Sequence, residues 1–296
     1  MVIDAHIHLY PAEVFADPQA WGTARRESWW TQCVAPPDRR SLQGWAAIDQ
    51  LLRDMDAAGI DQAVLLGWYW ENHNTCVIQN NWYSSWQRAH PDRLHAFATV
   101  NPAAGHAAIE ETRRCFEAGF LGLGELLPAV QGFSFSDEPW AALMELCAAW
   151  GKPVNLHVSD PGLLARAPLA PTPLNELVAV AKAFPHNRFV LAHWGGGLPW
   201  LELNRRTGRA LGNCVYDCAA SPLLYDPAVY ARCLDLVGPH RLCFGTDYPL
   251  LVYPKTQTQP SFREALEEAR SNLPAAAHQA FFGGNIQRVL GLAGLS

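Results

Sequence analysis

Short apolar segments alternate with longer amphipathic segments along the whole of this 296-residue chain. Eight of the short segments have the length and the near-continuous apolar character of buried parallel strands. They cover residues 2–5, 63–66, 95–100, 119–123, 153–156, 188–192, 214–216 and 241–244. Between them, residues 42–58, 103–118, 140–150, 174–184, 198–211 and 227–237 have the pattern of helices. Strands that alternate with helices pair in parallel, because each connection has to cross back over the sheet.

Eight such units favour a sheet that closes on itself. Closure removes both exposed edges, which an open parallel sheet would have to protect in another way. An open, doubly wound α/β sheet is the alternative. Hydrophobic residues make up 49% of the chain and charged residues 17%, which is enough apolar material for one large core. We therefore predict a (β/α)8 TIM barrel that forms a single domain over residues 1–296.

Residues 9–41 interrupt this alternation directly after the first strand. The segment contains Trp21, Trp29 and Trp30 and the pair Pro36-Pro37, and it is too polar and too broken for one regular element. A long excursion at this place in a barrel is usually a functional loop. Alternatively, it covers the barrel mouth without touching a substrate. We predict an inserted loop at the mouth.

Charge and composition limit the partners of the chain. Its net charge of -6 argues against a nucleic-acid or anionic membrane surface, because both require clustered Lys and Arg. The sequence opens with Met1-Val2-Ile3-Asp4, without the basic and apolar stretches of a signal peptide. No segment approaches the roughly 20 apolar residues that a membrane-spanning helix needs. We expect a cytoplasmic protein that acts on a small-molecule substrate, with a homodimer as a possible assembly.

His6 and His8 lie two residues apart at the end of the first predicted strand. Residues at this spacing project from the same face of a strand. In a TIM barrel, the carboxyl ends of the strands carry the active site. Two imidazoles this close form a good pair of ligands for a borderline metal such as Zn²⁺. Alone, the pair is a weak signal, because His-x-His also occurs by coincidence on surfaces and in cores.

Four further predicted strands are followed by side chains of the metal-ligand type. Glu125 follows the fourth strand, His157 the fifth, His193 the sixth and Asp247 the eighth. On a closed barrel, all of them would converge with the first pair at one mouth. A lone histidine behind a strand is more often a structural core residue, but coincidence does not easily explain six ligand-type side chains on five strand ends. The sequence therefore predicts a site for a divalent metal.

Such an ion would support hydrolytic chemistry. It lowers the pKa of a bound water to near 7 and polarises a carbonyl group as a Lewis acid. Asp247, beside that water, could accept its proton and return it to the leaving group. His193 could stabilise the developing oxyanion if it is not itself a ligand. Asp247 and His193 are thus the candidate catalytic residues.

The set of residues, in this order and with these neighbours, resembles the amidohydrolase superfamily. The segments Ala-His-Trp-Gly-Gly (192–196), Phe-Gly-Thr-Asp-Tyr-Pro (244–249) and residues 283–290 resemble characteristic segments of its amidohydrolase-related branch. That branch holds small metal-dependent hydrolases and nonhydrolytic decarboxylases. The similarity extends from residue 2 to about residue 292. It is specific for the superfamily and only weakly specific for a reaction.

The resemblance implies a set of metal ligands, namely His6, His8, His157 and Asp247. The residue that matches His193 in this branch either binds a second metal or contacts the substrate and the activated water. Asp247 would also move protons in hydrolytic members. Many superfamily hydrolases bridge two metals with a carboxylated lysine at the fourth strand, where this chain has Glu125. With Glu125 and His193 in the predicted ligand set, we expect one or two divalent ions, Zn²⁺ being the first choice.

Candidate substrate-binding residues lie in the segments that follow the strands. Trp68, Tyr69 and His73 come after the second predicted strand. The aromatic pair could form the wall of a substrate pocket, or it could pack against the Trp-rich first loop. Candidates to hold a substrate carboxylate lie in predicted mouth loops: Arg166, Tyr253 and Lys255.

The complete ligand set favours an enzyme. Our first hypothesis is a metal-dependent hydrolase that cleaves an ester, lactone or amide bond of a small organic acid with metal-activated water. The alternative is a nonhydrolytic, metal-dependent decarboxylase of an aromatic or unsaturated carboxylic acid, in which His193 and Asp247 protonate a carbanion-like intermediate. A catalytically silent metal-binding barrel is the third hypothesis. It predicts a lost ligand, and none is missing.

Overall fold

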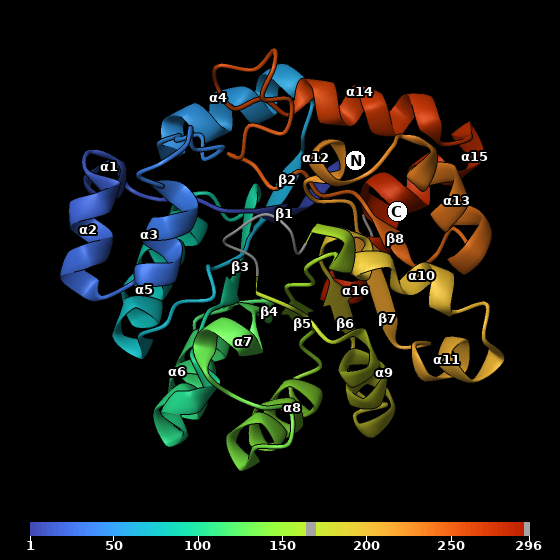
Figure 1. Ribbon diagram of the computed structural model, residues 1–296, viewed down its shortest axis with the longest axis horizontal. Coiled ribbons are helices and arrows are strands. Elements are labelled where there is room, and N and C mark those ends of the chain that lie inside the picture. The colour runs from blue at the N-terminus through green and yellow to red at the C-terminus, as the bar shows by residue number, and fades with distance from the viewer. Residues whose placement is uncertain (164–169, 293–296) are drawn as a thin grey trace.

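A computed structural model describes residues 1–163 and 170–292, and within them eight strands form one parallel sheet. Each strand pairs with the next one along the chain (Figure 1). The strands are β1 (Ile3–Ile7), β2 (Gln62–Leu65), β3 (Leu94–Ala98), β4 (Gly122–Leu126), β5 (Val154–Leu156), β6 (Phe189–Leu191), β7 (Cys214–Asp217) and β8 (Leu242–Cys243). Every one overlaps a strand that the sequence predicts.

The first strand also pairs with the chain at and after β8. The backbone N–H of Ala5 donates to the carbonyl of Phe244 at 2.8 Å, and that of His8 donates to Tyr248 at 2.7 Å. The pairing is parallel, as in the rest of the sheet. These bonds close the sheet and remove both of its edges. The predicted (β/α)8 barrel is therefore confirmed, and the open sheet is excluded.

The strands carry apolar side chains on both faces, as buried parallel strands do. The outer faces pack against the surrounding helices in one large core. A smaller core joins side chains from six strands, which can meet only inside the barrel. Its members are Ile3, Ala5, Val64, Leu66, Phe97, Val190, Val215, Cys243, Ile286, Val289 and Leu290. The last three belong to α16 (Asn285–Leu290), which therefore plugs the end of the barrel where the strands begin.

Helices surround the barrel on all sides (Figure 1). They are α1 (Ala12–Phe15), α2 (Pro18–Arg25), α3 (Ser28–Val34), α4 (Ile48–Ala58), α5 (His73–Ala89), α6 (His106–Glu117), α7 (Pro128–Gln131), α8 (Glu138–Ala149), α9 (Leu174–Ala183), α10 (Leu198–Leu201), α11 (Arg205–Ala210), α12 (Ser221–Leu224), α13 (Ala228–Val237), α14 (Arg263–Asn272), α15 (Ala275–Gln279) and α16. Single turns of tighter or wider helix are η1 (Pro102–Ala104), η2 (Pro161–Leu163), η3 (His193–Gly197) and η4 (Ala280–Gly284). Within residues 1–163 and 170–292, no helix combines the length and the apolarity that crossing a membrane requires.

Four predicted helices are confirmed as α6, α8, α9 and α13, and two others differ in extent. The helix predicted over 42–58 begins only at Ile48. The helix predicted over 198–211 is divided into α10 and α11. The division has a local cause, because the side chain of Asn204 accepts hydrogen bonds from the backbone N–H groups of Arg206 and Thr207 and so starts a new helix.

Helix α5 is a long element that the sequence pattern did not reveal. Its buried face is polar and includes Gln79 and Asn80. Gln79 accepts a hydrogen bond from the backbone of Trp68 at 2.9 Å. Asn80 bonds both the N–H and the carbonyl of Thr99, at 2.9 and 2.8 Å. This helix is thus fastened to the chain that follows β2 and β3 by hydrogen bonds, so the apolar periodicity that identifies a helix is weak.

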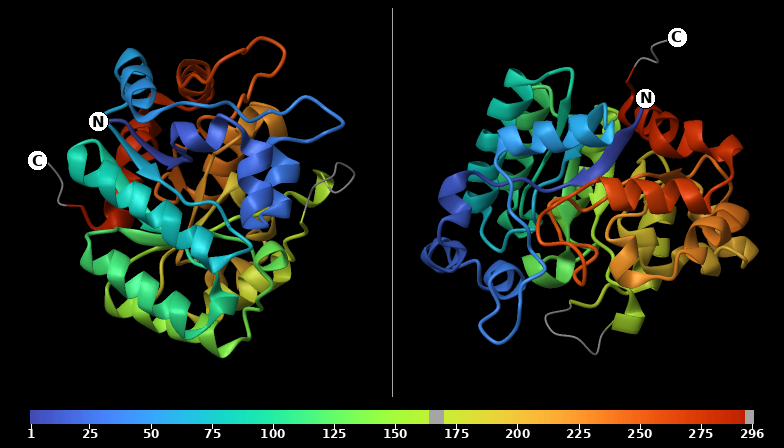
Figure 2. Two further views of the ribbon diagram at one scale, coloured as in Figure 1. Left: turned by 90° about the vertical axis from the view of Figure 1, so that its left-hand side faces the viewer. Right: turned by 90° about the horizontal axis from the view of Figure 1, so that it is seen from above.

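The excursion of residues 9–41 folds into the three short helices α1, α2 and α3. It lies at the end of the barrel opposite the N-terminus, which is the end where the strands finish (Figure 2). Its aromatic residues form a cluster with the chain after β2, made of Tyr10, Val14, Trp21, Trp30, Val34, Trp70 and Cys76. The predicted mouth insertion is therefore an ordered cap with its own small core.

Two glutamates join the excursion to the segment after β2. The carboxylate of Glu27 is buried and accepts from the backbone N–H of Glu71 at 2.8 Å and of Asn72 at 3.2 Å. In return, Glu71 accepts from the backbone N–H of Trp29 at 2.7 Å and from the hydroxyl of Ser28 at 2.8 Å. Burial raises the pKa of Glu27, and the two N–H donors oppose that rise. We refer to this pair as the Glu27–Glu71 clamp.

Replacing Glu27 with Ala should destabilise the protein. The change leaves two backbone N–H groups without their partner, so we expect the free energy of unfolding to fall by about 1–3 kcal/mol. Urea denaturation measures it. Glu13→Ala, an exposed position in α1, is the matched control and should change the free energy by less than about 0.5 kcal/mol. An equal effect of the two variants would contradict the clamp.

Candidate metal centre

Two imidazoles at the end of β1 face each other through their Nε2 atoms, which lie 3.2 Å apart. Both side chains are buried. His8 uses Nδ1 to donate to the carbonyl oxygen of Leu66 at 2.9 Å, which leaves the lone pair on Nε2. The Nδ1 of His6 lies 3.0 Å from a carboxylate oxygen of Asp217. Two lone pairs at this separation repel each other unless a proton or a cation lies near both.

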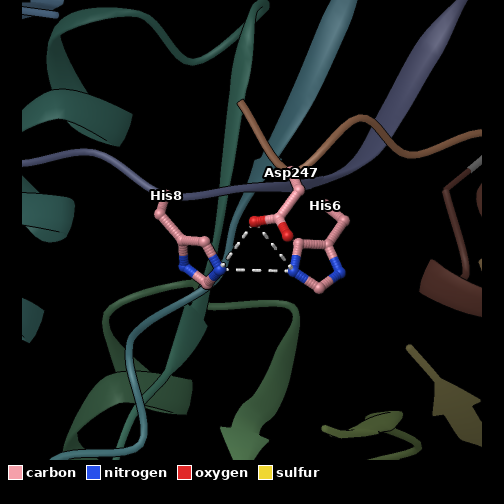
Figure 3. Close-up of side chains that lie close together, drawn as sticks. All are labelled: His6, His8 and Asp247. Carbon is pink, nitrogen blue, oxygen red and sulfur yellow. Dashed lines mark hydrogen bonds and ion pairs between the residues drawn. The ribbon is translucent and has the colours of Figure 1, made fainter. Parts of the chain in front are cut away.

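Asp247 approaches this pair from the chain after β8 (Figure 3). Its Oδ1 lies 3.4 Å from Nε2 of His8 and 3.9 Å from Nε2 of His6. Its backbone N–H donates to the carbonyl of His6 at 2.9 Å, so the closure of the barrel sets its position. Its φ of +67° lies in the left-handed region, which is uncommon for a residue other than glycine and clusters at functional sites.

Glu125 and His193 complete a second group around the same first strand. One ligand atom from each of these residues and one from His6 all lie within 4.8 Å of one another. Glu125 also places Oε2 at 3.8 Å from Nε2 of His8. His193 donates from Nδ1 to the carbonyl of Ala219 at 3.0 Å, so its Nε2 faces the group. His6 therefore belongs to both groups of three.

His157 follows β5 and lies on the far side of Glu125 from the first strand. Its Nδ1 is 2.9 Å from Oε1 of Glu125 and 3.3 Å from Nε2 of His193. Unlike the other imidazoles, it turns Nδ1 toward its neighbours. All six predicted ligands thus lie in one continuous cluster at the mouth, and their roles as ligands stay predictions.

Glycine holds the backbone directly before Glu125. Gly124 has a φ of +133°, and a Cβ at this position would overlap the carbonyl oxygen of Asn155 in β5. At the end of β6, His193 and Trp194 have φ values of +58° and +56° and start the left-handed turn η3. The backbone at both strand ends therefore depends on conformations or contacts that few side chains allow.

The imidazoles of the cluster differ in basicity. Burial, together with the charge of His6, lowers the pKa of His8 to about 4. Burial and the charge of His157 lower the pKa of His193 to about 4. Burial would also lower the pKa of His6, but the charge and hydrogen bond of Asp217 raise it to about 10. The rings of His8 and His193 therefore favour the neutral form, whereas His6 favours the positively charged form.

The pKa values of the two carboxylates in the cluster are shifted in opposite directions. Burial raises the pKa of Asp247 to about 7, and the charge of His6 opposes the rise. Burial would also raise the pKa of Glu125, but the charges of His157 and His6 hold it well below its usual range. Glu125 is therefore ionised and contributes a fixed negative charge to the middle of the cluster.

These donors fit a divalent cation. The cluster offers imidazole nitrogens with free lone pairs, an ionised carboxylate and a centre that favours positive charge. Mixed imidazole and carboxylate ligands suit Zn²⁺ and Mn²⁺. A group of three protein ligands leaves open positions for substrate or water, as catalytic sites require. The two groups share His6, and because its Nδ1 faces Asp217, its one remaining nitrogen can bind a single ion.

A cavity of about 130 Å³ opens directly on the cluster. It is lined by His8, Cys33, Val34, Leu42, Gln43, Trp68, Tyr69, Glu125, His157, His193, Asp247, Pro249 and Leu250. The rings of Trp68 and Tyr69 stack with centroids 4.3 Å apart, and the ring of Tyr69 lies 4.9 Å from that of His157. The excursion reaches the cavity through Cys33 and Val34, so it does more than cover the barrel.

The other predicted substrate contacts lie elsewhere. Among the described residues that line the cavity, His73, Tyr253 and Lys255 do not occur. His73 opens α5, and the hydroxyl of Tyr253 donates to Glu268 of α14 at 2.9 Å. Arg166 lies outside the described residues. Of the residues predicted to bind substrate that lie in the described part of the chain, Trp68 and Tyr69 line the cavity.

The family model for amidohydrolases matches residues 3–292, nearly the whole chain. The chain belongs to the amidohydrolase family. The resemblance seen in the sequence is thereby confirmed, and the protein is an enzyme. The match covers every strand and every residue of the cluster, so no part of the site lies outside the shared region.

Solved structures similar to this chain include several decarboxylases. The 5-carboxyvanillate decarboxylase of Sphingomonas paucimobilis aligns with a TM-score of 0.73 at 17% identity, covering 99% of both chains. That of Novosphingobium aromaticivorans, in complex with manganese and 4-hydroxy-3-methoxy-5-nitrobenzoic acid, aligns at 0.72 and 17%, covering 99% and 96%. The 2,6-dihydroxybenzoate decarboxylase of Rhizobium aligns at 0.69 and 16%, covering 99% of both. At these identities, the likeness shows the shared fold.

Several residues of this site did not stand out in the sequence. Asp217 ends β7 in the same way that the predicted ligands end their strands, so the rule applied to the other strands would have found it. The cavity residues Leu42 and Gln43 were missed because the sequence placed them in a helix that begins only at Ile48, and Leu250 lies in a connecting segment without a periodic pattern. Only the folded chain brings them to the mouth.

Binding of a divalent ion should stabilise this protein against heat. An ion that binds only the folded state adds about 2.7 kcal/mol at one hundred times its Kd. We expect Zn²⁺ or Mn²⁺, added to protein stripped with a chelator, to raise the Tm measured by calorimetry. His8→Ala should lose most of this rise. His186→Ala, an exposed histidine outside the cluster, should keep it. A full rise in His8→Ala would contradict the metal centre.

Proposed function

We propose that this protein is a nonoxidative decarboxylase that requires a divalent metal and acts on a small hydroxylated aromatic carboxylic acid. The observation that carries the proposal is an aromatic-walled cavity directly against a cluster of metal-type donors. The similar structures support it as well, since decarboxylases of aromatic acids align with this chain over nearly its full length. The comparisons thus favour the alternative left open by the sequence over the hydrolase that we expected first.

The cavity suits one aromatic ring. Its volume of about 130 Å³ is close to that of an engineered apolar cavity of about 150 Å³ that admits benzene. The stacked pair Trp68–Tyr69 forms one wall. Val34 and Leu250 add apolar surface. A flat ring can lie between these surfaces with its carboxylate directed at the cluster.

The cluster would hold the metal through His6, His8 and Asp247, with Glu125 and His193 as the second group. A bound divalent cation supplies a fixed positive charge that orients anionic oxygens of the substrate and offsets negative charge in the transition state. The protein contributes the orientation of the rings that would bind this cation. Hydrogen bonds to Leu66 and Ala219 fix the rings of His8 and His193 and so fix the geometry of the site.

Decarboxylation needs a proton at the ring carbon that loses the carboxylate. The bond between that carbon and the carboxyl carbon breaks, and its electron pair forms a new C–H bond with a proton from a general acid. Carbon dioxide leaves. Asp247 and His193 both line the cavity. Asp247 Oδ and His193 Nε2 are the atoms that can hold this proton, since Nδ1 of His193 is engaged with Ala219.

We propose that either Zn²⁺ or Mn²⁺ fills the site. Zn²⁺ follows from the imidazole-rich donor set, and by the usual order of divalent affinities it binds more tightly than Mn²⁺. Mn²⁺ is the ion in the Novosphingobium aromaticivorans enzyme. We expect Zn²⁺ to have the lower Kd here, whichever ion gives the higher turnover.

Hydrolysis of an ester, lactone or amide bond is the second candidate. It is favoured by Glu125, a member of the second donor group, whose two carboxylate oxygens lie 3.8 Å from Nε2 of His8 and 3.8 Å from Nε2 of His193. A carboxylate in this position can bridge two ions. Two-metal sites activate water as a nucleophile for hydrolysis.

A substrate panel separates the two candidates. Protein loaded with Mn²⁺ or Zn²⁺ should release carbon dioxide from 2,6-dihydroxybenzoate or a related hydroxybenzoate. The cavity volume predicts slower release from 5-carboxyvanillate, which carries extra substituents on the ring. Carbon dioxide is measured by a coupled assay, and loss of the acid by ultraviolet absorbance. Turnover of lactones, esters or amides without carbon dioxide release would establish hydrolysis and refute the decarboxylase.

Replacing Asp247 with Asn should abolish most turnover. General acid catalysis typically contributes 10²- to 10⁴-fold, roughly the loss we expect in kcat. The fold should persist, because the backbone N–H of residue 247 still donates to His6. Metal content, measured on the same samples, separates loss of the ion from loss of the acid. Asp235→Asn, an exposed position in α13, is the control. Unchanged kcat in Asp247→Asn would remove Asp247 from the mechanism.

A further inference from the structure

Asp217 is a fully buried carboxylate at the end of β7, which pairs with β6 on one side and with β8 on the other. Its Oδ2 lies 3.0 Å from Nδ1 of His6. Its Oδ1 accepts from the backbone N–H of His193 at 3.0 Å and of Ala219 at 3.0 Å. Both oxygens are therefore engaged. A single side chain ties together the candidate ligands of β1 and β6.

Asp217 differs from the predicted metal ligands in its relation to the cavity and in the nitrogen of His6 that it contacts. It does not line the cavity, so it does not reach a substrate there. It also points at Nδ1 of His6, whereas His8 and Asp247 lie on the Nε2 side of that ring. A carboxylate on the outer nitrogen of an imidazole keeps the proton on that nitrogen and makes the other nitrogen a stronger donor.

We propose that Asp217 is a positioning residue that holds His6 with its Nε2 lone pair toward the cation and so sets the affinity of the metal site. The inference rests on the metal-binding role proposed for His6, and it does not depend on which reaction the enzyme catalyses. The same carboxylate fixes the backbone at His193, so it positions donors from both groups. A purely structural Asp217 would affect stability and leave the metal affinity unchanged.

Asp217→Asn tests this role at constant size. The amide can still accept from the backbone N–H groups of His193 and Ala219 through Oδ1. Its NH₂ would then face Nδ1 of His6, which forces the imidazole proton onto Nε2, where the cation binds. We expect the Kd for Zn²⁺ and for Mn²⁺ to rise 10- to 100-fold, the usual effect of losing such a partner. Isothermal titration calorimetry with each metal alone measures both values.

Asp4→Asn is the matched control. Asp4 is also a fully buried carboxylate, and it accepts from the backbone N–H of His6 and of Thr246 and from the Thr246 hydroxyl. It contacts no imidazole nitrogen. In Asp4→Asn the amide oxygen can keep both backbone bonds, and the NH₂ group can donate to the Thr246 hydroxyl, which reverses the third bond. We expect its metal Kd to equal that of the wild type. Equal Kd values in Asp217→Asn and the wild type would overturn the role of Asp217. A wild-type protein that binds neither metal would instead overturn the metal centre itself.

A measurement on the unmodified protein covers the case in which Asp217→Asn does not fold. In ¹⁵N-labelled wild-type protein loaded with ¹¹³Cd²⁺, His6 should couple to the metal through Nε2 and carry its proton on Nδ1. Nuclear magnetic resonance detects both features. Coupling through Nδ1 would overturn the inference, because that nitrogen would then face the metal and not Asp217.

Discussion

The pairing of β1 with the chain after β8 is the contact on which the site depends. It joins the two ends of the sheet through the hydrogen bonds of His8 to Tyr248 and of Asp247 to His6. The same bonds place the carboxylate of Asp247 3.4 Å from Nε2 of His8. Closure of the fold and assembly of the donors are therefore one event. Before the barrel closes, no contact holds Asp247 close to His6 and His8, which lie at the other end of the sequence.

Closure of the barrel also buries several charged groups, and removing them from water has a cost in free energy. Glu125 and Asp217 are ionised and buried, and an isolated buried carboxylate would be strongly unfavourable. The positive charge on His6 offsets part of this cost. In return, burial acts to lower the pKa of His6, but the charges of Asp217 and Glu125 raise it. A divalent cation beside Nε2 of His6 would take over that role with a larger charge. The electrostatics of the protein without metal thus already favour a cation at this point.

The sequence predicted the parts of this protein that follow from periodicity. Apolar runs located all eight strands, and ligand-type residues at strand ends located the cluster, because parallel strands finish at one mouth. It missed α5, whose buried polar residues Gln79 and Asn80 bond to backbone and hide the helical pattern. It also could not tell that Trp68 and Tyr69 reach the cavity whereas His73 does not. Only the three residues 70–72 lie between Tyr69 and His73, which is the first residue of α5, and only tertiary packing fixes such differences.

The excursion determines what the cavity can accept. One wall consists of Trp68 and Tyr69 after β2, and the excursion supplies Cys33 and Val34. The Glu27–Glu71 clamp and the aromatic cluster join these two segments, so the separation of the walls is set by buried hydrogen bonds and packing. A rigid cavity discriminates by size, because an added substituent has to displace packed side chains. In a fold shared by many enzymes, the barrel supplies the donor cluster, and the contacts of this excursion set the walls of the cavity beside it.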